Sequence, residues 1–266
     1  MLLATFVLFL AVIVQIYLDT NFFKVVEVQF QTKKIPSGEE IKILQISDLH
    51  NKVFGRDNEP LVEAIHQAGA DIIVITGDLI DRRTDDLGHA FSLIERMTAR
   101  HQHVYFINGN HENASPLRQE LLDGLAERGV IVLNNQNVEM TVRNTTFHLV
   151  GVDDGPKRNL DAALNGVDLD RYLVLLSHRP DIVARYADNP VDLILSGHTH
   201  GGQVRLPFIG AIYAPNQGLF PKLDKGTYRI IGDRYLYIDS GLGTTHLPIR
   251  FLNKSQMSLI RIVGSE

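Results

Sequence analysis

Short apolar runs alternate with amphipathic stretches in the first half of the chain, and each run ends in polar residues. The runs are short and rich in β-branched residues, as in DIIVIT at 71–76, so they predict buried strands. Apolar residues at helical spacing predict helices between and after them. The resulting order is β-α-β-α-β. In chain order the predicted elements are 41–47, 61–68, 71–76, 87–100, 104–107 and 116–128.

Strand signals continue through the second half, and Asn-rich turns favour antiparallel pairing where it begins. Strands are predicted at 130–133, 138–142, 146–152, 172–177, 191–196, 228–232, 235–239 and 257–263, and a helix at 181–187. No repeat or low-complexity linker divides residues 41–266, which we treat as one domain. This pattern predicts an α/β fold in which two mixed sheets pack face to face and are flanked by helices.

The N-terminus begins with an uncharged apolar segment, residues 2–18, which as a helix would span about 26 Å. We interpret residues 1–20 as a membrane anchor, with a signal peptide or a buried helix as the alternatives. A signal peptide is disfavoured because the segment lacks a basic start and a small-residue cleavage site. Residues 21–40 are predicted to be a connecting segment that contains a strand at 25–30 and a turn at 35–38.

Basic residues set the expected orientation of this segment. Lys24, Lys33 and Lys34 are the nearest basic residues, and all of them follow the apolar stretch. The positive-inside rule therefore predicts that the main domain lies on the cytoplasmic face of the membrane.

Composition limits the partners and the metal ligands. The formal net charge is -5 and the 26 basic residues form no dense run, so a nucleic-acid partner is not expected. With no cysteine in the chain, any metal must be bound by His, Asp, Glu or Asn side chains. The oligomeric state stays open.

The polar residues that follow the predicted strands are all oxygen or nitrogen ligand types. In chain order they are Asp48, His50, Asp78, Asn110, His111, His178, His198 and His200. Taken singly, a His-x-His pair can be a hydrogen-bonded surface loop, and an Asp or Asn can cap a loop. Five strands that all end in such groups instead predict a composite site at the carboxyl edge of a sheet.

This order of motifs (D-x-H, G-D, G-N-H-E, H and G-H-T-H) resembles the calcineurin-like metallophosphoesterase superfamily from residue 41 to the C-terminus. The resemblance implies two divalent metal ions, with Mn as first choice and Fe or Zn as alternatives. In such sites the ions lie about 3.5 to 4 Å apart and stabilise the charge that develops at phosphorus. One ion would be bound by Asp48, His50 and His200, the other by Asn110, His178 and His198, and Asp78 would bridge both.

The resemblance also suggests residues that contact the substrate. His111 would be catalytic, contacting the phosphoryl group and protonating the leaving oxygen. Glu112 is either a helix-start carboxylate or a partner of His111. His246 and Arg250 resemble a C-terminal motif of a membrane-associated subgroup, where they would either reach the phosphate or stabilise a hairpin. Arg205 is a further candidate for contact with a lipid phosphate.

Within the superfamily the chain is similar to small bacterial enzymes with a hydrophobic N-terminus and a GHTHGGQ-x-R-L-P loop. Some of these are phosphodiesterases, and some cleave the pyrophosphate of UDP-2,3-diacylglucosamine in lipid A biosynthesis. We therefore expect a two-metal hydrolase that cleaves a phosphodiester or pyrophosphate bond in a membrane-associated or lipid-linked substrate. The alternatives are a phosphoprotein or small-molecule phosphatase, which an open cleft without apolar walls would favour, and a metal-binding scaffold without catalysis.

The stretch after the histidine loop, residues 204–220, is rich in large apolar side chains, but its prolines and glycines break any long regular element. These side chains either pack beneath the loop or form an apolar lip beside the metals. A lip next to an N-terminal anchor would place the site at the bilayer surface.

Overall fold

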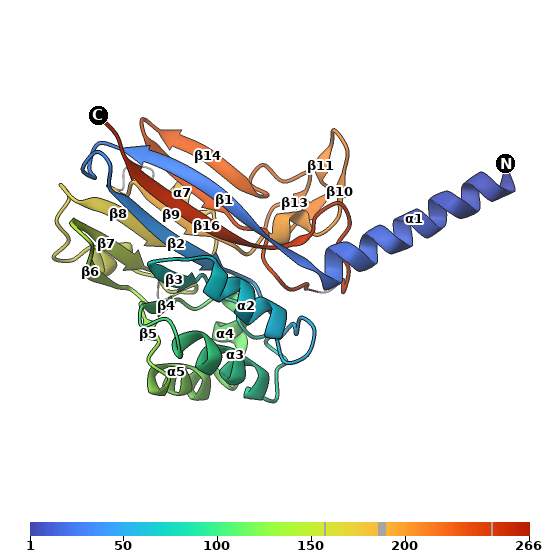
Figure 1. The fold of residues 1–266 in the computed structure, drawn as a ribbon, viewed down its shortest axis with the longest axis horizontal. Coiled ribbons are helices and arrows are strands. Elements are labelled where there is room, and N and C mark those ends of the chain that lie inside the picture. The colour runs from blue at the N-terminus through green and yellow to red at the C-terminus, as the bar shows by residue number, and fades with distance from the viewer. Residues whose placement is uncertain (157, 186–189, 246) are drawn as a thin grey trace.

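Two mixed β-sheets pack face to face and have helices on their outer faces, while helix α1 (Leu2–Asn21) projects from one end (Figure 1). The computed structural model describes residues 1–156, 158–185, 190–245 and 247–266. The fold class predicted from the hydrophobic pattern is confirmed, including the N-terminal apolar helix.

The first sheet has the strand order β1-β16-β2-β3-β4-β5. Its strands are β1 (Phe23–Thr32), β2 (Glu40–Ile46), β3 (Ile72–Ile75), β4 (Val104–Phe106), β5 (Ile131–Val132) and β16 (Ser255–Gly264). Strands β2 to β5 run parallel, whereas β16 is antiparallel to β2 and parallel to β1. Helices α2 (Glu59–Gln67), α3 (Gly88–Thr98) and α5 (Arg118–Glu127) pack on its outer face.

The second sheet has the strand order β14-β15-β9-β8-β7-β6. Its strands are β6 (Gln136–Val142), β7 (Thr145–Gly151), β8 (Tyr172–Leu176), β9 (Leu193–Ser196), β14 (Gly226–Ile231) and β15 (Arg234–Ile238). Its four central strands are parallel, and the edge strands β6 and β14 are antiparallel to their neighbours. Helices α6 (Leu160–Ala163) and α7 (Ile182–Arg185) pack outside it. The end of the helix predicted at 181–187 lies outside the described residues.

Alternation along the strands divides the apolar side chains between the sheet interface and the outer layers. In β2, Ile43 packs between the two sheets and Leu44 packs toward the helices of the first sheet. In β8, Val174 and Leu175 are divided in the same way, and all four side chains are fully buried. Because both faces of these strands are covered, they read as continuous apolar runs in the sequence.

The stretch predicted as a connecting segment contributes an edge strand to the first sheet. Strand β1 begins before and ends after the strand predicted at 25–30, and each of its residues from Phe23 to Thr32 has a partner in β16. Because the β1 pairing partner lies near the other end of the chain, local patterning could not show that this segment belongs to the sheet.

Helix α1 lies outside the core. Among the described residues it is the one helix long and apolar enough to cross a membrane, and it is exposed along nearly all of its length. The buried-helix alternative is therefore wrong, while an anchor and a signal sequence both fit this helix. Only its last turn is fixed: the Asp19 carboxylate accepts from the Asn253 N–H at 3.2 Å, and the Thr20 hydroxyl accepts from the Arg250 N–H at 2.9 Å.

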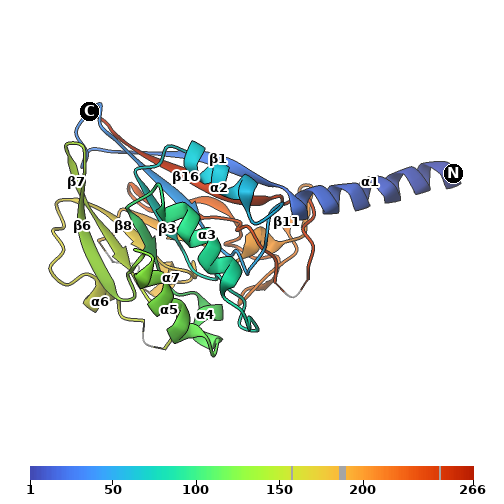
Figure 2. The same cartoon turned by 60° about the horizontal axis from the view of Figure 1, so that its bottom comes forward.

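Residues 204–220 form two small antiparallel hairpins beside the end of the sandwich from which α1 leaves (Figures 1 and 2). Their strands are β10 (Arg205–Leu206), β11 (Gly210–Ala211), β12 (Tyr213–Ala214) and β13 (Gly218–Leu219). Most of their large apolar side chains do not pack beneath the histidine loop. Those exposed to solvent are Leu206, Phe208, Ile209, Tyr213, Leu219 and Phe220.

Candidate metal centre

The polar groups that follow β2, β3, β4, β8 and β9 meet at one edge of the sandwich. In each case the chain leaves the strand and turns within a few residues, so the side chain is presented where the carboxyl ends of the parallel strands converge. Most of these groups form two adjoining clusters of side chains that could bind metal ions, and His50 and His111 form a third such group with Asp81.

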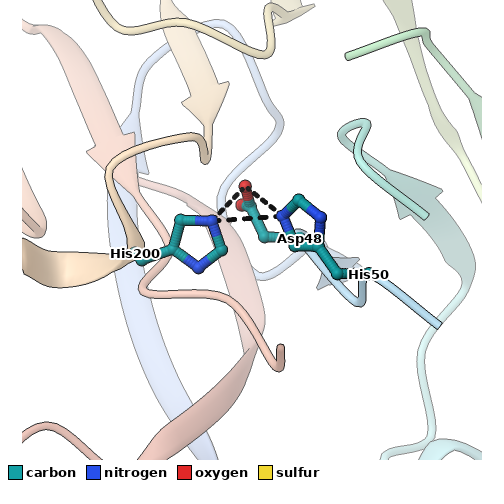
Figure 3. A group of neighbouring side chains, drawn as sticks. All are labelled: Asp48, His50 and His200. Carbon is teal, nitrogen blue, oxygen red and sulfur yellow. Dashed lines mark hydrogen bonds and ion pairs between the residues drawn. The ribbon is translucent and has the colours of Figure 1, made fainter. Parts of the chain in front are cut away.

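The first cluster consists of Asp48, His50 and His200 (Figure 3). The Nε2 atoms of the two histidines are 3.2 Å apart, and Asp48 Oδ1 lies 3.4 Å from His200 Nε2 and 4.0 Å from His50 Nε2. The three atoms surround a common point. Ser47 Oγ donates to Asp48 at 2.5 Å and the His198 N–H donates at 3.0 Å, which fixes the carboxylate.

The second cluster consists of Asp78, His178 and His198, with Asn110 beside them. His198 Nδ1 lies 3.1 Å from His178 Nε2, which is 3.2 Å from Asn110 Oδ1. With its oxygen inward, the Asn110 amide presents an oxygen to the second cluster, as a metal ligand would. With its nitrogen inward it donates to both histidine rings, at 3.2 and 2.8 Å.

The Asp78 carboxylate lies between the two clusters. Its Oδ2 atom is 3.6 Å from His50 Nε2 in the first cluster and 3.2 Å from His178 Nε2 in the second. The other oxygen accepts a hydrogen bond from the His111 N–H at 2.8 Å. An oxygen within reach of both clusters is in the position that a bridging ligand requires.

The donor set of these clusters fits divalent cations. Each cluster has two imidazole nitrogens facing one another at close range, and only one proton can lie between such a pair. The Thr76 carbonyl accepts from His178 Nδ1 at 2.8 Å, which leaves the Nε2 lone pair of that ring directed into the second cluster. Carboxylates converge on the same points from within a buried environment. A cation in each cluster would satisfy these lone pairs together, and Mn, Fe and Zn all accept such a mixture.

Burial and mutual charge shift the titration of these groups. Burial raises the pKa of Asp48 to about 7 and lowers the pKa of His50 to about 4. Burial alone would lower the pKa of His178, but the charge and hydrogen bond of Asp78 outweigh it and raise that pKa to about 10. The cluster therefore holds a proton on His178 at neutral pH, and a bound cation would replace that proton.

The backbone around these clusters adopts conformations that are rare for residues with a side chain. Asp48, His50, Asp78, His198 and His200 all have φ between 49° and 69°, in the left-handed region. Such conformations cost of order 1 to 3 kcal/mol each and persist only where the surrounding structure imposes them. They allow each tight turn to direct its side chain back across the strand ends.

Two glycines allow the loops to approach one another. A Cβ at Gly197 would collide with Ser47 Oγ and Asp48 Oδ2, and a Cβ at Gly109 would collide with the Asp78 carboxylate. The glycines of the G-H-T-H and G-N-H-E motifs therefore have a steric role at this edge.

His111 lies beside the clusters with a partner for each protonation state of its Nδ1 atom. The Arg82 N–H is 3.1 Å from Nδ1 and can donate to it when it is bare, while Asp81 Oδ2 is 3.0 Å away and can accept when it is protonated. On the other side of the ring, Arg82 Nη2 is 3.2 Å from Nε2. Burial lowers the pKa of His111.

Of the two roles predicted for Glu112, the structure supports that of a helix-start carboxylate. It is fully buried at the start of α4 (Asn110–Ala114), a short helix that was not predicted. Its side chain accepts from the N–H groups of Gly109 and Asp78 at 2.8 Å and of Ile80 at 3.1 Å. This one carboxylate therefore joins the loop after β3 to the loop after β4.

The guanidinium groups of the two predicted phosphate-binding arginines make contacts inside the protein. Arg250 is completely buried, and its guanidinium donates to the carbonyls of Ser240 at 2.7 Å and Gly243 at 2.6 Å, so it stabilises a loop. Arg205 pairs with Asp224 at 2.6 Å and lines a separate surface depression. His246 lies outside the described residues.

A cavity of about 770 Å³ opens onto the clusters. Its polar wall includes Arg82 and Arg179, which sequence reasoning missed. The GDLIDRR run contained a signal for Arg82, since Asp81 and Arg82 follow closely after Asp78. Asn216 was missed as well: its side-chain amide lies 3.1 Å from His198 Nε2, a contact that the turn of the β12–β13 hairpin creates.

Comparison with known proteins gives matches along nearly the whole chain. The sequence profile of the calcineurin-like phosphoesterase family matches residues 41–202. An uncharacterised metallophosphoesterase of Aquifex aeolicus is 33% identical over 97% of this chain and 99% of its own length. The uncharacterised metallophosphoesterase YkuE of Bacillus subtilis is 30% identical over 92% of this chain and 87% of its own length. A transmembrane protein with a metallophosphoesterase domain from Danio rerio is 27% identical over 89% of this chain and 56% of its own length.

The matched region contains every residue of the two clusters. The relatives from Aquifex aeolicus and Bacillus subtilis also match over most of their own length, so the likeness extends well beyond the motifs. With its metal-binding histidines and aspartates gathered at the strand ends, this chain belongs to the calcineurin-like phosphoesterase family and is a metal-dependent phosphoesterase.

Proposed function

We propose that this phosphoesterase hydrolyses a phosphodiester or pyrophosphate bond in a lipid-linked substrate, of which UDP-2,3-diacylglucosamine is an example. The observation that carries the proposal is the composition of the cavity. Its lining combines polar side chains with a set of apolar ones, here called the apolar wall; the polar ones include Asp78, Asn110, His198, His200, His111, Arg82 and Arg179. The apolar residues are Val204, Ile212, Tyr213, Pro215 and Leu247. Such a cavity matches a substrate with an anionic centre and an acyl chain.

Two divalent cations, with Mn as first choice, would supply Lewis acidity and an activated water for in-line attack at phosphorus. Asp48, His50 and His200 would bind one, Asn110, His178 and His198 the other, with Asp78 shared between them. The chain would then position the substrate: Arg82 and Arg179, both in the cavity lining, would bind non-bridging phosphoryl oxygens. His111 is the proposed proton donor to the leaving oxygen; this role requires the protonated ring, in which Asp81 accepts from Nδ1.

The apolar wall disfavours a phosphoprotein phosphatase, which would be expected to have an open cleft without such a wall. A binding scaffold without catalysis is disfavoured because every ligand type of the family motifs is present and the side chains converge. A small-molecule phosphatase would use only the polar half of the cavity and would leave Leu247 and Tyr213 without a role.

We also propose that α1 anchors the enzyme with its domain on the cytoplasmic face. Of the lysines on which this orientation was based, Lys34 lies beyond the far end of β1, where it pairs with Asp192 at 2.9 Å. Lys24 remains beside the helix, and Lys254 joins it there, with its Nζ 5.9 Å from the centre of the Phe22 ring. Basic residues at this end of α1 support the same orientation through the positive-inside rule.

A substrate panel tests the proposed function. Full-length protein reconstituted with Mn²⁺ would be assayed on a phosphomonoester, a soluble phosphodiester and a nucleotide-linked diacylated sugar. We expect kcat/KM to be highest for the nucleotide-linked lipid, because only that substrate occupies both walls of the cavity.

The matched control is a short-chain analogue with the same nucleotide and sugar. A preference for the monoester, or equal rates on the lipid and its short-chain analogue, would contradict the proposal. Absence of turnover on every substrate with two metal ions bound would favour the scaffold alternative.

A further inference from the structure

We propose that the catalytic domain has a second membrane contact besides α1, which docks it on a bilayer surface that contains anionic lipids. The docking surface consists of an apolar tip and a lysine ring. The tip is formed by Leu206, Phe208, Ile209 and Leu252, and the ring by Lys24, Lys52, Lys225 and Lys254. The inference does not depend on which phosphate ester the enzyme cleaves.

The apolar tip presents large side chains to solvent at a strained turn. Phe208 lies between β10 and β11 with φ of 66° and is fully exposed. Ile209 beside it is 57% exposed, and Leu252, with φ of 50°, is 42% exposed and lines the same shallow depression. Left-handed φ is a true outlier for bulky residues, and exposing them in water recovers no free energy. Insertion into an apolar phase would supply the missing stabilisation.

Hydrogen bonds connect the tip to the base of α1. The Arg205 N–H donates to the Phe251 carbonyl at 3.0 Å, so β10 is joined to the loop at 250–253. The same loop is joined to the last turn of α1 through Asp19 and Thr20. The hairpins and the helix therefore share one anchoring loop, and both views place them at the same end of the molecule (Figures 1 and 2).

The residues of the lysine ring lie near the point where α1 meets the domain. Lys52 Nζ donates to Asn21 Oδ1 at 3.2 Å, and Lys254 lies over Phe22. Lys225 donates to Asn253 Oδ1 at 2.9 Å. Burial lowers the pKa of Lys225 to about 8, and the charges of Arg205 and Lys24 add to this effect. Cations at the level where an apolar helix emerges complement anionic lipid head groups, at about 1 kcal/mol per basic residue.

The docking surface adjoins the mouth of the catalytic cavity. Tyr213 and Leu247 line that cavity and are each more than half exposed. Ile212, also in the lining, donates its N–H to the Val204 carbonyl at 3.3 Å, next to β10. A domain seated on the membrane through the tip would therefore hold the apolar wall of the cavity close to the lipid.

Charge favours a lipid surface over a second copy of the chain as the occupant. In a symmetric dimer built on this surface, the lysine ring of one copy would face the same ring of its partner, and like charges would repel. Anionic head groups instead match the ring, and acyl chains match the tip.

The test uses the absence of tryptophan and cysteine from the chain. Full-length Phe208→Trp protein, whose single tryptophan can be excited selectively over its eight tyrosines, would be reconstituted into phosphatidylcholine vesicles with about one third phosphatidylglycerol, with and without bromine on the acyl chains. We expect brominated lipid to reduce its fluorescence about twofold, because a tip inserted into the interface lies within contact range of the bromine atoms. The matched control is Leu169→Trp, since Leu169 is 53% exposed and lies beside Lys34, away from α1.

Equal fluorescence in brominated and plain vesicles for Phe208→Trp would overturn the proposal. The proposal would also be overturned if neither brominated lipid nor acrylamide quenched the tryptophan fluorescence. That result would indicate that position 208 contacts another protein copy. A second arm uses two test variants, Lys24→Glu and Lys254→Glu, and the exposed control Lys33→Glu, each in the Phe208→Trp background. We expect quenching to fall only in the first pair. Turnover of a soluble diester should stay unchanged in all variants, so failure of docking is distinguishable from failure of hydrolysis.

Discussion

The strand-end site and the docking surface both depend on left-handed backbone conformations, but they use them in opposite ways. At the site, Asp78 and His200 turn inward, are buried and meet other polar groups within hydrogen-bonding distance. At the docking surface, Phe208 and Leu252 turn outward and meet solvent. At the site the strained residues make polar contacts inside the protein, whereas at the proposed docking surface their side chains face solvent. The comparison assigns catalysis to the strand-end site and membrane contact to the proposed docking surface. Substitutions at the two regions should therefore affect different properties of the enzyme.

The largest effect is expected for Asp78→Asn. The variant keeps the shape of the side chain but removes the charge shared by the two clusters, so turnover of a soluble diester should fall by about 10³-fold or more. Circular dichroism and the melting temperature would check that the fold survives. Full activity in this variant would exclude the two-metal assignment of the site.

The next effect is expected for His111→Ala, with turnover falling by about 10²- to 10⁴-fold. Because His111 is assigned to the substrate, metal content measured by elemental analysis should stay at two ions per chain. Loss of one ion would show that His111 is a ligand, and the group formed by His50, Asp81 and His111 would then have to be reconsidered as a cation site.

Metal affinity should depend on pH. His178, with its pKa near 10, carries a proton at pH 7 that a cation must displace, and Asp48, with its pKa near 7, adds a second competing proton at lower pH. Apparent affinity should therefore rise with pH from 7 to 9, by about tenfold per unit for each proton displaced. Competition with a chromophoric chelator measures this slope, and a flat profile would contradict the assignment of His178.

The smallest effect is expected for the double variant Phe208→Asp with Ile209→Asp. Loss of the apolar tip should lower activity on a lipid-linked substrate in vesicles by about tenfold and leave activity on a soluble diester unchanged. Leu169→Asp is the matched control for adding charge to an exposed apolar position. Equal losses on both substrates would mean that the tip supports the fold, and would contradict its assignment to membrane contact.

The hydrophobic pattern was sufficient to predict most of the sandwich, because strands covered on both faces are apolar at successive positions. It also predicted which polar groups follow the strands, since parallel strands such as β2 and β3 must bring their carboxyl ends to one edge. The ligand assignments themselves stay predictions, and the distances between the side chains are compatible with them.

What the sequence could not show depends on contacts between distant segments. Arg250 looks the same in the sequence whether it binds a phosphate or three backbone carbonyls, and only the folded loop decides between them. Asn216 reaches His198 through a hairpin whose strands are two residues long, below the length at which periodicity is informative. Among the described strands, β1 likewise joins the sheet only through β16, a dependence on a segment near the other end of the chain.

That last dependence has a consequence for how the protein is made. The residues that fix the base of α1 are 234 positions apart in the Asn253–Asp19 contact, and β1 pairs with no described strand other than β16. At about 5 to 20 residues per second, a ribosome needs about 10 to 50 s to synthesise the intervening chain. During this interval α1 has already emerged, while the partner strand of β1 has not yet been made. Closure of the catalytic domain is therefore a late event in biogenesis, and chains stalled before residue 255 should remain protease-sensitive in β1.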